Sequence, residues 1–461
     1  MDPSQAIDAL TKVLPSGQLA VRGTQEYEDL NGSYQSIRSG ETQPAAIFRP
    51  KSADEVSTFV QTIRPFALSG QAPFAIFGAG QQPALGCNNI QGGITLNLSL
   101  LTGITRWGAV YEKLDPLGLS VAGGRSARNG IGGLALQGGL SFFSSREGFI
   151  ADNVVNYQVV LASGDIADAN ATDHPDLWRA LRGGGNNFGV VTRFDLRTFK
   201  QGALYGGSIY YFSPSFPSEI QKPGATPETH LMISVGFAVV FGPDPMCQNQ
   251  VYYTQAVDKP EVLEPLTSVQ PQIDQLNTLR LIPNVTEAAN EQAGDQQVAK
   301  RAAYMNVTVK SDVATLQAAA NIYTAAIDPV KSTEGLICSL TLQPYAESLL
   351  QSSAAKGGDM LGLGTNSGSL VNLLLLSYWS NASDDATILG AMRTALQGID
   401  QDAASKGTKV GYVYMNYASE DQDVIGSYGY ENTKFLQETS KKYDPEGLFQ
   451  KGVPGGWKLF T

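Results

Sequence analysis

The residues best suited to chemistry begin with a glycine-rich turn, Phe77-Gly78-Ala79-Gly80-Gln81-Gln82-Pro83, which follows the apolar run Phe74 to Phe77. Small residues let a backbone turn tightly and bring its N–H groups close to a diphosphate. Gln81 and Gln82 add side-chain amides, which form hydrogen bonds but are poor nucleophiles. Taken alone, a Gly-Ala-Gly turn after a strand is more often simply a turn.

Further glycine-rich segments follow in order. Gly123-Gly124-Arg125-Ser126 leads to a segment from Gly130 to Ser141, and Asp152-Asn153-Val154 comes next. A fourth segment, residues 174–191, contains Gly-Gly-Gly-Asn-Asn and ends at Val190-Val191. Such glycine density suits a backbone that lies flush against a flat ring and a phosphate chain. The alternative is a glycine-rich sandwich that binds no ligand.

The tail adds a tyrosine-rich motif, Tyr412-Val413-Tyr414-Met415-Asn416-Tyr417. We expect a short strand over Gly411 to Tyr417. On a strand, Tyr414 and Asn416 share one face and Tyr417 takes the other. A tyrosine-rich edge strand without a binding role would show the same pattern.

Taken together, these motifs resemble the flavin-linked oxidases of the vanillyl-alcohol oxidase and berberine-bridge-enzyme type, whose FAD-binding domain is of the PCMH type. The resemblance runs from about Pro44 to Phe460 and favours a fungal-type member of secondary metabolism. It implies FAD as cofactor, with contacts from Gly78, Ala79, Gly80, Gln81, Gln82, Gly124, Ser126, Gly130, Gly133, Ser141, Asn153, Val154, Val191, Asn416 and Tyr417.

The same resemblance implies how the flavin is held. Many members tether it through a histidine at the position of Gln81, and some add a cysteine at the position of Ser126. Neither residue of this chain can form such a bond in that way. We therefore expect FAD to be bound without a covalent link.

The proton acceptor is harder to identify. By resemblance Tyr414 faces the substrate, and it serves as base if its neighbours lower its pKa from about 10. His230, at the start of an apolar strand, is a weaker candidate. His174 precedes Pro175 and is expected to begin a helix. The carboxylates show no readable pairing.

The composition narrows the function classes. The 461 residues are 42% hydrophobic and 16% charged, which indicates an ordered chain with a large interior and more than one substructure. A net charge of -11 disfavours nucleic acid and anionic membranes as partners. Three scattered cysteines are expected to be free thiols, and two histidines are too few for most metal sites. No metal is expected, and the chain is expected to be a monomer or a homodimer.

The first residues have neither a basic flank nor an apolar run. As written, this predicts a cytoplasmic protein. A signal peptide removed before the numbering would make it secreted.

The pattern along the chain and the resemblance together predict an α+β protein. A strand, a helix capped by Ser52 and a second strand should lead into the glycine turn, with later strands at Val154 to Leu161 and Val190 to Thr192. Residues 1–200 form the PCMH-type FAD-binding domain in this interpretation. Residues 201–410 form an inserted substrate domain, an antiparallel sheet covered by helices, and residues 411–461 return to the first domain.

Within the substrate domain we expect strands at Leu231 to Phe241 and Leu370 to Tyr378, and helices at Val313 to Ile327 and Asp384 to Ile399. A terminal helix is expected near Glu431 to Lys442.

The predicted function is an FAD-dependent oxidase or dehydrogenase that oxidises an apolar small molecule in a natural-product biosynthetic pathway, with O2 as acceptor. A cyclase of the Diels–Alder type, in which FAD is structural or a bystander, is the main alternative. The aliphatic run Leu373 to Leu376 is compatible with both. A catalytically silent binding protein is a third possibility.

Overall fold

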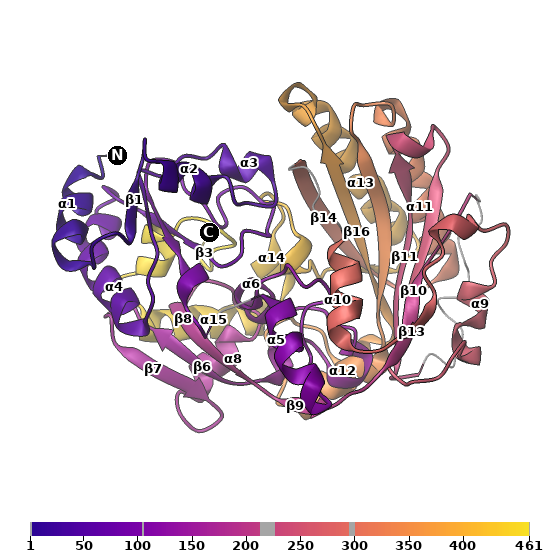
Figure 1. Ribbon diagram of the computed structural model, residues 1–461, viewed down its shortest axis with the longest axis horizontal. Coiled ribbons are helices and arrows are strands. Elements are labelled where there is room, and N and C mark those ends of the chain that lie inside the picture. The colour runs from indigo at the N-terminus through magenta and orange to yellow at the C-terminus, as the bar shows by residue number, and fades with distance from the viewer. Residues whose placement is uncertain (1, 104–105, 213–225, 295–299, 461) are drawn as a thin grey trace.

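The protein is described by a computed structural model that covers residues 2–103, 106–212, 226–294 and 300–460. Two groups of elements lie side by side (Figure 1). The N-terminal part of the chain and its C-terminal tail form one group, and an eight-stranded sheet with its helices forms the other. Residues 213–225 and 295–299 of the predicted substrate domain lie outside the described residues.

The N-terminal group begins with a four-stranded sheet of order β1-β2-β4-β3. Its strands are β1 (Leu19–Val21), β2 (Ala46–Phe48), β3 (Phe74–Phe77) and β4 (Ile94–Asn97). Helix α4 (Ala53–Leu68) connects β2 to β3, and the hydroxyl of Ser52 accepts a hydrogen bond from Glu55 N at 3.2 Å. The predicted strand, capped helix and strand before the glycine turn are confirmed.

A second, three-stranded antiparallel sheet has the order β7-β6-β8. It contains β6 (Val154–Val160), β7 (Ile166–Asn170) and β8 (Val190–Leu196), and the short strands β5 (Leu119–Val121) and β9 (Thr198–Lys200) pair beside it. The helices of this part are α1 (Ser4–Val13), α2 (Gln25–Asn31), α3 (Ile37–Gly40), α5 (Trp107–Leu114), α6 (Ile131–Leu136), α7 (Ser144–Glu147) and α8 (Pro175–Leu181).

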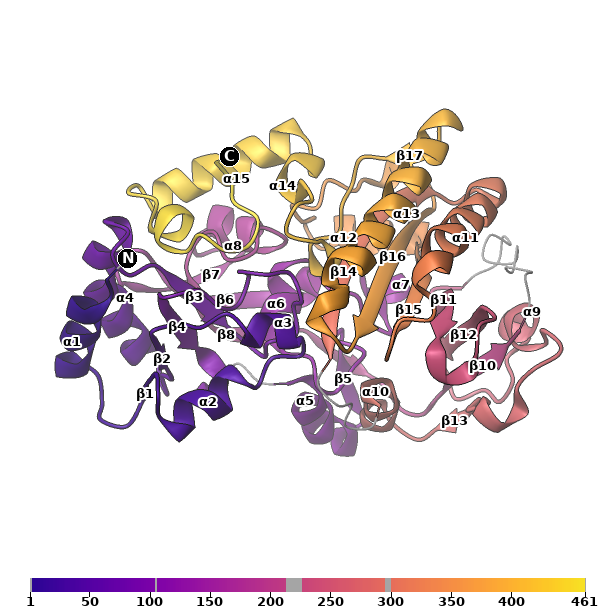
Figure 2. The ribbon, with the colours of Figure 1, turned by 90° about the horizontal axis from the view of Figure 1, so that it is seen from above.

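The large sheet is antiparallel throughout and has the order β13-β10-β12-β11-β15-β16-β14-β17. Its strands are β10 (Leu204–Tyr211), β11 (Thr229–Ala238), β12 (Met246–Tyr253), β13 (Arg280–Ile282), β14 (Arg301–Lys310), β15 (Ile337–Tyr345), β16 (Leu370–Trp379) and β17 (Lys409–Val410). Helices α11 (Val313–Ile327) and α13 (Asp385–Ser405) cover one face (Figure 2). The opposite face turns toward the N-terminal group.

Side chains alternate between the two faces along β16, so the aliphatic run Leu373 to Leu376 is divided between them. Leu373 and Leu375 belong to the apolar core beneath α11 and α13, so they cannot contact a ligand in the other group. Only Leu374 and Leu376 lie on the face toward the N-terminal group, in register with Asn306 and Tyr304 of β14.

Shorter helices complete the group that contains the eight-stranded sheet. They are α9 (Glu264–Thr267), α10 (Val285–Ala293) and α12 (Glu347–Ala355). Beyond the sheet, α14 (Val424–Ser427) and α15 (Tyr430–Tyr443) bring the tail back to the N-terminal group, where α15 packs beside α8 (Figure 1). No helix among the described residues combines the length and apolarity needed to span a bilayer.

The strand predicted over Gly411 to Tyr417 is wrong. Only β17 (Lys409–Val410) pairs with the sheet, and Met415–Tyr417 forms a 3-10 helix. The physical reason lies in β14, where the Asn306 side chain takes both backbone groups of Tyr414: its Oδ1 accepts from Tyr414 N at 2.9 Å, and its Nδ2 donates to Tyr414 O at 3.0 Å. The Asn306 side chain thus makes the hydrogen bonds to Tyr414 that a neighbouring strand would make in a sheet.

Candidate functional site

A cavity of about 260 Å³ lies where the two groups meet. Its wall is formed by the glycine turn after β3, the segment around α6, the residues just before β8, the C-terminal tail and β14. The residues predicted as cofactor contacts that line it are Gly78, Ala79, Gly80, Gln81, Gln82, Gly130, Gly133, Val191, Asn416 and Tyr417. Tertiary folding therefore brings together segments more than 300 residues apart in the sequence.

The glycine turn presents unpaired backbone donors to this cavity. The N–H groups of residues 79–82 have no acceptor among the described residues. Gly80 has φ of 67°, a left-handed conformation that glycine adopts without strain. A row of free N–H groups around a left-handed residue attracts anionic oxygens. The turn is therefore suited to a diphosphate.

Glycines also keep the cavity wall free of side chains. A Cβ built on Gly78, Gly132 or Gly133 would contact nothing in the chain, so these backbones face open space in the cavity. At Gly130 a Cβ would instead lie 2.6 Å from Cβ of Ala79. Gly130 therefore allows the α6 segment to lie directly against the turn. Bare backbone beside free amides fits a flat ring joined to a diphosphate, as in FAD.

The two glutamines of the turn hold the loop itself. Gln81 Nε2 donates to the carbonyl of Ala79 at 3.3 Å, and Gln82 Nε2 donates to the carbonyls of Met415 and Asn416 at 3.3 and 3.4 Å. Gln82 thus connects the turn directly to the tail motif.

Cys87 is a free thiol that also lines the cavity. Burial raises the pKa of the Cys87 thiol to about 12. It is therefore protonated near neutral pH, and a protonated thiol is a poor nucleophile. Among the described residues the three cysteines form no disulfide, as predicted.

Asn416 and Tyr417 form the tail's contribution to the wall. Asn416 Oδ1 accepts from Gly139 N at 3.2 Å, and Asn416 Nδ2 donates to Gln137 Oε1 at 3.1 Å. The Tyr417 hydroxyl accepts from Arg125 Nη2 at 2.6 Å and donates to Gln343 Oε1 at 3.2 Å. The α6 segment and β15 thus orient these side chains.

Tyr414 lies behind this wall and does not line the cavity. It is fully buried, and its hydroxyl has no hydrogen-bond partner among the described residues. Its ring meets that of Tyr417 edge to face at 4.9 Å, so the two side chains are neighbours rather than on opposite faces. Burial raises the pKa of Tyr414 well above its usual value, with the neighbouring Tyr417 as a second cause. The condition that its neighbours lower this pKa is contradicted.

Five other residues predicted as cofactor contacts also lie away from the cavity lining: Gly124, Ser126, Ser141, Asn153 and Val154. Gly124 is packed against Trp107, where a Cβ would come within 2.4 Å of the indole. Asn153 donates to the carbonyls of Glu147 and Phe149 and accepts from Lys356 Nζ. Their role in binding the cofactor stays a prediction.

The two histidines have separate positions. His174 precedes α8 with φ of 52°, and its Nδ1 lies 2.9 Å from the carbonyl of Asp168, which confirms the predicted helix start. His230 is buried on β11 with Nε2 3.1 Å from Arg125 Nη1. Burial, followed by the charge of Arg125, lowers the pKa of His230 well below its usual value.

The sheet adds cavity residues that motif reasoning missed. Gln35 and Tyr304 line the wall, and Gln35 Nε2 donates to the hydroxyls of Tyr304 and Tyr378 at 3.2 and 3.3 Å. The two tyrosine hydroxyls are also hydrogen bonded to each other. No local signal marks Gln35, whereas alternation along β14 places Tyr304 on the same face as Asn306.

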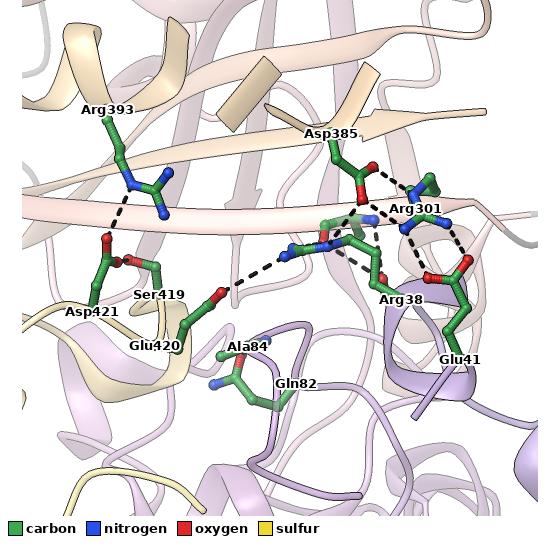
Figure 3. A network of polar contacts seen from close by, with 12 residues as sticks. Arg38, Glu41, Gln82, Ala84, Arg301, Asp385, Arg393, Ser419, Glu420 and Asp421 are labelled. Carbon is green, nitrogen blue, oxygen red and sulfur yellow. Dashed lines mark hydrogen bonds and ion pairs between the residues drawn. The ribbon is translucent and has the colours of Figure 1, made fainter. Parts of the chain in front are cut away.

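An ion-pair network beside the site joins three segments of the chain (Figure 3). The guanidinium of Arg301, whose side chain is 5% exposed, contacts both Glu41 and Asp385. Arg38 lies 3.7 Å from Glu420 and 4.0 Å from Asp385. The segment after Gln35, the sheet group and the tail are thereby held together.

Sequence comparison matches residues 44–170 to the family described as FAD binding domain. An FAD-dependent monooxygenase of Fusarium proliferatum is 34% identical over 457 residues, covering 92% of this chain and 87% of the relative. An FAD-dependent monooxygenase of Cochliobolus heterostrophus is 33% identical, covering 90% and 85%.

Solved structures share the fold. The carbohydrate oxidase of Microdochium nivale aligns with a TM-score of 0.78 at 19% identity, over 99% of this chain and 100% of that one. The 6-hydroxy-D-nicotine oxidase of Arthrobacter nicotinovorans aligns with a TM-score of 0.76 at 19% identity, over 94% and 96%. Both alignments extend across the cavity and the large sheet.

Proposed function

Because the chain belongs to the FAD-dependent oxidoreductases of the vanillyl-alcohol oxidase and berberine-bridge-enzyme-like superfamily, we propose that it oxidises an apolar small molecule in a natural-product pathway. FAD held by the glycine turn and the bare backbone of the cavity wall would supply the hydride acceptor, and O2 would be the final electron acceptor. The protein supplies binding, orientation and a proton acceptor.

The observation that carries this proposal is the cavity itself. Its wall combines bare backbone and the free N–H groups of residues 79–82 with the side chains of Tyr304 and Tyr417. Leu374 and Leu376 extend the sheet face beside Tyr304. A cofactor on the amide side would therefore meet a substrate held by aromatic and aliphatic side chains with a few neutral polar groups.

Non-covalent attachment is part of the same proposal. Gln81 stands in the turn, Ser126 is not in the lining, and Cys87 keeps its proton. None of these groups is a good nucleophile near neutral pH. The free amides and the close backbone contacts would hold FAD instead.

Insertion of an oxygen atom into the substrate is a second candidate, favoured by the names of the Fusarium and Cochliobolus relatives as monooxygenases. The two candidates differ in their products. An oxidase releases one hydrogen peroxide for each substrate oxidised, whereas a monooxygenase transfers one atom of O2 to the product. The cyclase interpretation stays a prediction.

Anaerobic mixing with panels of apolar alcohols, phenols and polycyclic aromatic compounds tests the proposal. A substrate of an oxidase should bleach the flavin band without oxygen, and air should restore it. Mass spectrometry of the product formed under labelled O2 separates the two candidates, because only a monooxygenase incorporates the label. Complete turnover without any flavin reduction would refute the oxidase proposal and favour the cyclase.

A further inference from the structure

The large sheet places two tyrosines of neighbouring strands at the cavity. Tyr304 of β14 is in register with Leu376 of β16, and Tyr378 lies two residues further along β16, so the two tyrosines are diagonal neighbours on one face. Their rings meet edge to face with centroids 6.1 Å apart. The Tyr304 ring also meets that of Tyr417 edge to face at 6.3 Å. These two aromatic neighbours therefore fix the position of the Tyr304 ring.

Gln35 connects the two sheet tyrosines to the glycine turn. Its backbone N–H donates to the carbonyl of Gly80 at 2.9 Å. Its Nε2 donates to both tyrosine hydroxyls, at 3.2 Å to Tyr304 and at 3.3 Å to Tyr378. Gln35 thus holds the two hydroxyls in place relative to the loop that is suited to a diphosphate.

This cluster has one hydrogen-bond donor more than it uses. Each hydroxyl oxygen accepts from Gln35 Nε2, and one of the two O–H groups donates to the other tyrosine. The second O–H group has no acceptor among the described residues. Tyr304 lines the cavity and Tyr378 does not. When Tyr378 donates to Tyr304, the O–H of Tyr304 is therefore free to donate to a ligand.

Both hydroxyls keep their protons. Burial raises the pKa of Tyr304 above its usual value. Burial, followed by the charge of Tyr304, raises the pKa of Tyr378 well above its usual value. The two side chains are therefore neutral donors near neutral pH, and the O–H of Tyr378 polarises that of Tyr304 by donating to it.

The cavity wall is uncharged. The described residues that line it include no aspartate, glutamate, lysine, arginine or histidine, and their polar side chains are amides, phenols, a thiol and an indole. A carboxylate or an ammonium group of a substrate would lose water here without gaining an ion-pair partner, which is unfavourable. The wall therefore favours an uncharged substrate.

We propose that Tyr304 determines substrate specificity by donating its O–H to an uncharged acceptor oxygen of the substrate, a carbonyl or a hydroxyl oxygen, with Tyr378 and Gln35 as positioning residues. The inference names the substrate class of the proposed oxidation and so rests on the proposed function. An apolar molecule with such an oxygen would satisfy the free donor. A hydrocarbon of the same shape would leave that donor unpaired.

Binding of small probes to the FAD-loaded protein tests this inference without turnover. The probes are acetylnaphthalene and naphthol, with ethylnaphthalene and methylnaphthalene as their oxygen-free analogues, each titrated by the change in the flavin absorption spectrum. Tyr304→Phe should weaken binding of the two oxygen-bearing probes by about tenfold, the usual effect of one hydrogen bond, and leave the hydrocarbons within about twofold. The larger of the two losses identifies whether a carbonyl or a hydroxyl oxygen is preferred. Tyr210→Phe, at a hydroxyl that accepts from Gln248 outside the cavity lining, is the matched control.

Further measurements separate a direct contact from a change in the cluster. Tyr378→Phe keeps the O–H of Tyr304 and should weaken binding of the oxygen-bearing probes by under about threefold. The carbonyl stretching frequency of acetylnaphthalene should be lower when it is bound to the wild type than in hexane. Tyr304→Phe should abolish this difference, whereas Tyr378→Phe should keep most of it. Naphthoate, which is negatively charged, should bind at least about tenfold more weakly than acetylnaphthalene.

Several results would overturn the inference. One is a Tyr304→Phe protein that holds FAD and binds oxygen-bearing and oxygen-free probes with affinities changed by the same factor. Others are naphthoate binding as tight as that of acetylnaphthalene, and no saturable binding by any ketone or phenol of one to three fused rings. A carbonyl frequency in the wild type equal to that in hexane would overturn it without any variant.

The outcome is separable from that of the proposed function. An oxygen-specific loss of affinity in Tyr304→Phe, in a protein whose flavin no substrate reduces, would support the Tyr304 site and refute the proposed function alone.

Discussion

Asp359 should make the protein less stable as the pH rises through neutrality. It follows α12 in a segment that packs beneath the glycine-rich backbones, since a Cβ at Gly138 or Gly183 would lie 3.0 or 2.9 Å from Leu361. Nearby, Arg182 is fully buried and pairs with the fully buried Asp152 at 3.1 Å. Asp152 thus holds the arginine, although burial raises the pKa of Asp152 against the lowering effect of the Arg182 charge.

Burial, with the Asp152 charge as second cause, raises the pKa of Asp359 to about 7. In the unfolded chain an aspartate has a pKa near 3.8. The folded protein therefore binds more protons between these two values. The stability contributed by protonated Asp359 is fully present below about pH 4 and is lost as the pH rises through about 7.

A difference of about three pKa units corresponds to at most about 4 kcal/mol, because each unit is about 1.4 kcal/mol. The side chain keeps some contact with water, so we expect about 2 kcal/mol. Asp359→Asn removes the charge but keeps an Oδ1 that accepts from Leu361 N. The variant should be more stable than the wild type by under about 1 kcal/mol at pH 5, where the wild type has lost only part of this stability, and by about 2 kcal/mol at pH 8.

Urea unfolding at pH 5 and pH 8, with equal FAD present, measures the difference. Asp8→Asn, at an exposed position on α1, is the control and should leave the pH dependence as it is. If Asp359→Asn and the wild type lose stability in parallel between the two pH values, the assignment of the proton to Asp359 is wrong.

Three further predictions follow from the site. Acid precipitation of the wild type should release all flavin, whereas Gln81→His should retain some in the pellet; bound flavin in the wild-type pellet would contradict non-covalent attachment. Gly130→Ala, whose Cβ would lie 2.6 Å from the glycine turn, should weaken FAD binding by about tenfold, or about 1.4 kcal/mol, as titrated by flavin fluorescence. Gly390→Ala, with open space around it on α13, is its control and should bind FAD normally. Arg301→Ala should lower the free energy of unfolding by about 3 kcal/mol, because it removes the ion pair of Glu41 and leaves Asp385 only its longer contact with Arg38. Arg393→Ala, at an ion pair whose arginine side chain is 43% exposed, should cost under about 1 kcal/mol; equal losses in urea would refute this ranking.

Local patterns were sufficient for several elements. Ser52 and the apolar spacing behind it predicted α4, and the turn after β3 was recognised because glycines followed an apolar strand. Helix α11 has the bounds expected from its period. These features depend on neighbours within a few residues, so they can be predicted from the local sequence.

The tail motif shows where local reasoning fails. Its alternation predicted a strand, yet Asn306, more than 100 residues earlier, takes both backbone groups of Tyr414. A hydrogen-bond partner so far away in the sequence cannot be recognised from the residues of the motif. In the folded protein Tyr417 lines the cavity, as predicted for a cofactor contact, whereas Tyr414 lies outside the lining.

The chemistry of the chain therefore depends on two kinds of feature, those set by a single residue type and those set by residues that folding brings together. The glycine-rich motifs and their resemblance to a known family were enough to predict a flavin, and the residue types at the family's tether positions predicted non-covalent attachment, because nucleophilicity belongs to single residues. The electrostatic environment of a group and its burial are set only in the folded protein. Only the packing of the sheet against the glycine-rich segments placed Arg125 beside Tyr417, since electrostatic free energy depends on separation in space and on exclusion of water.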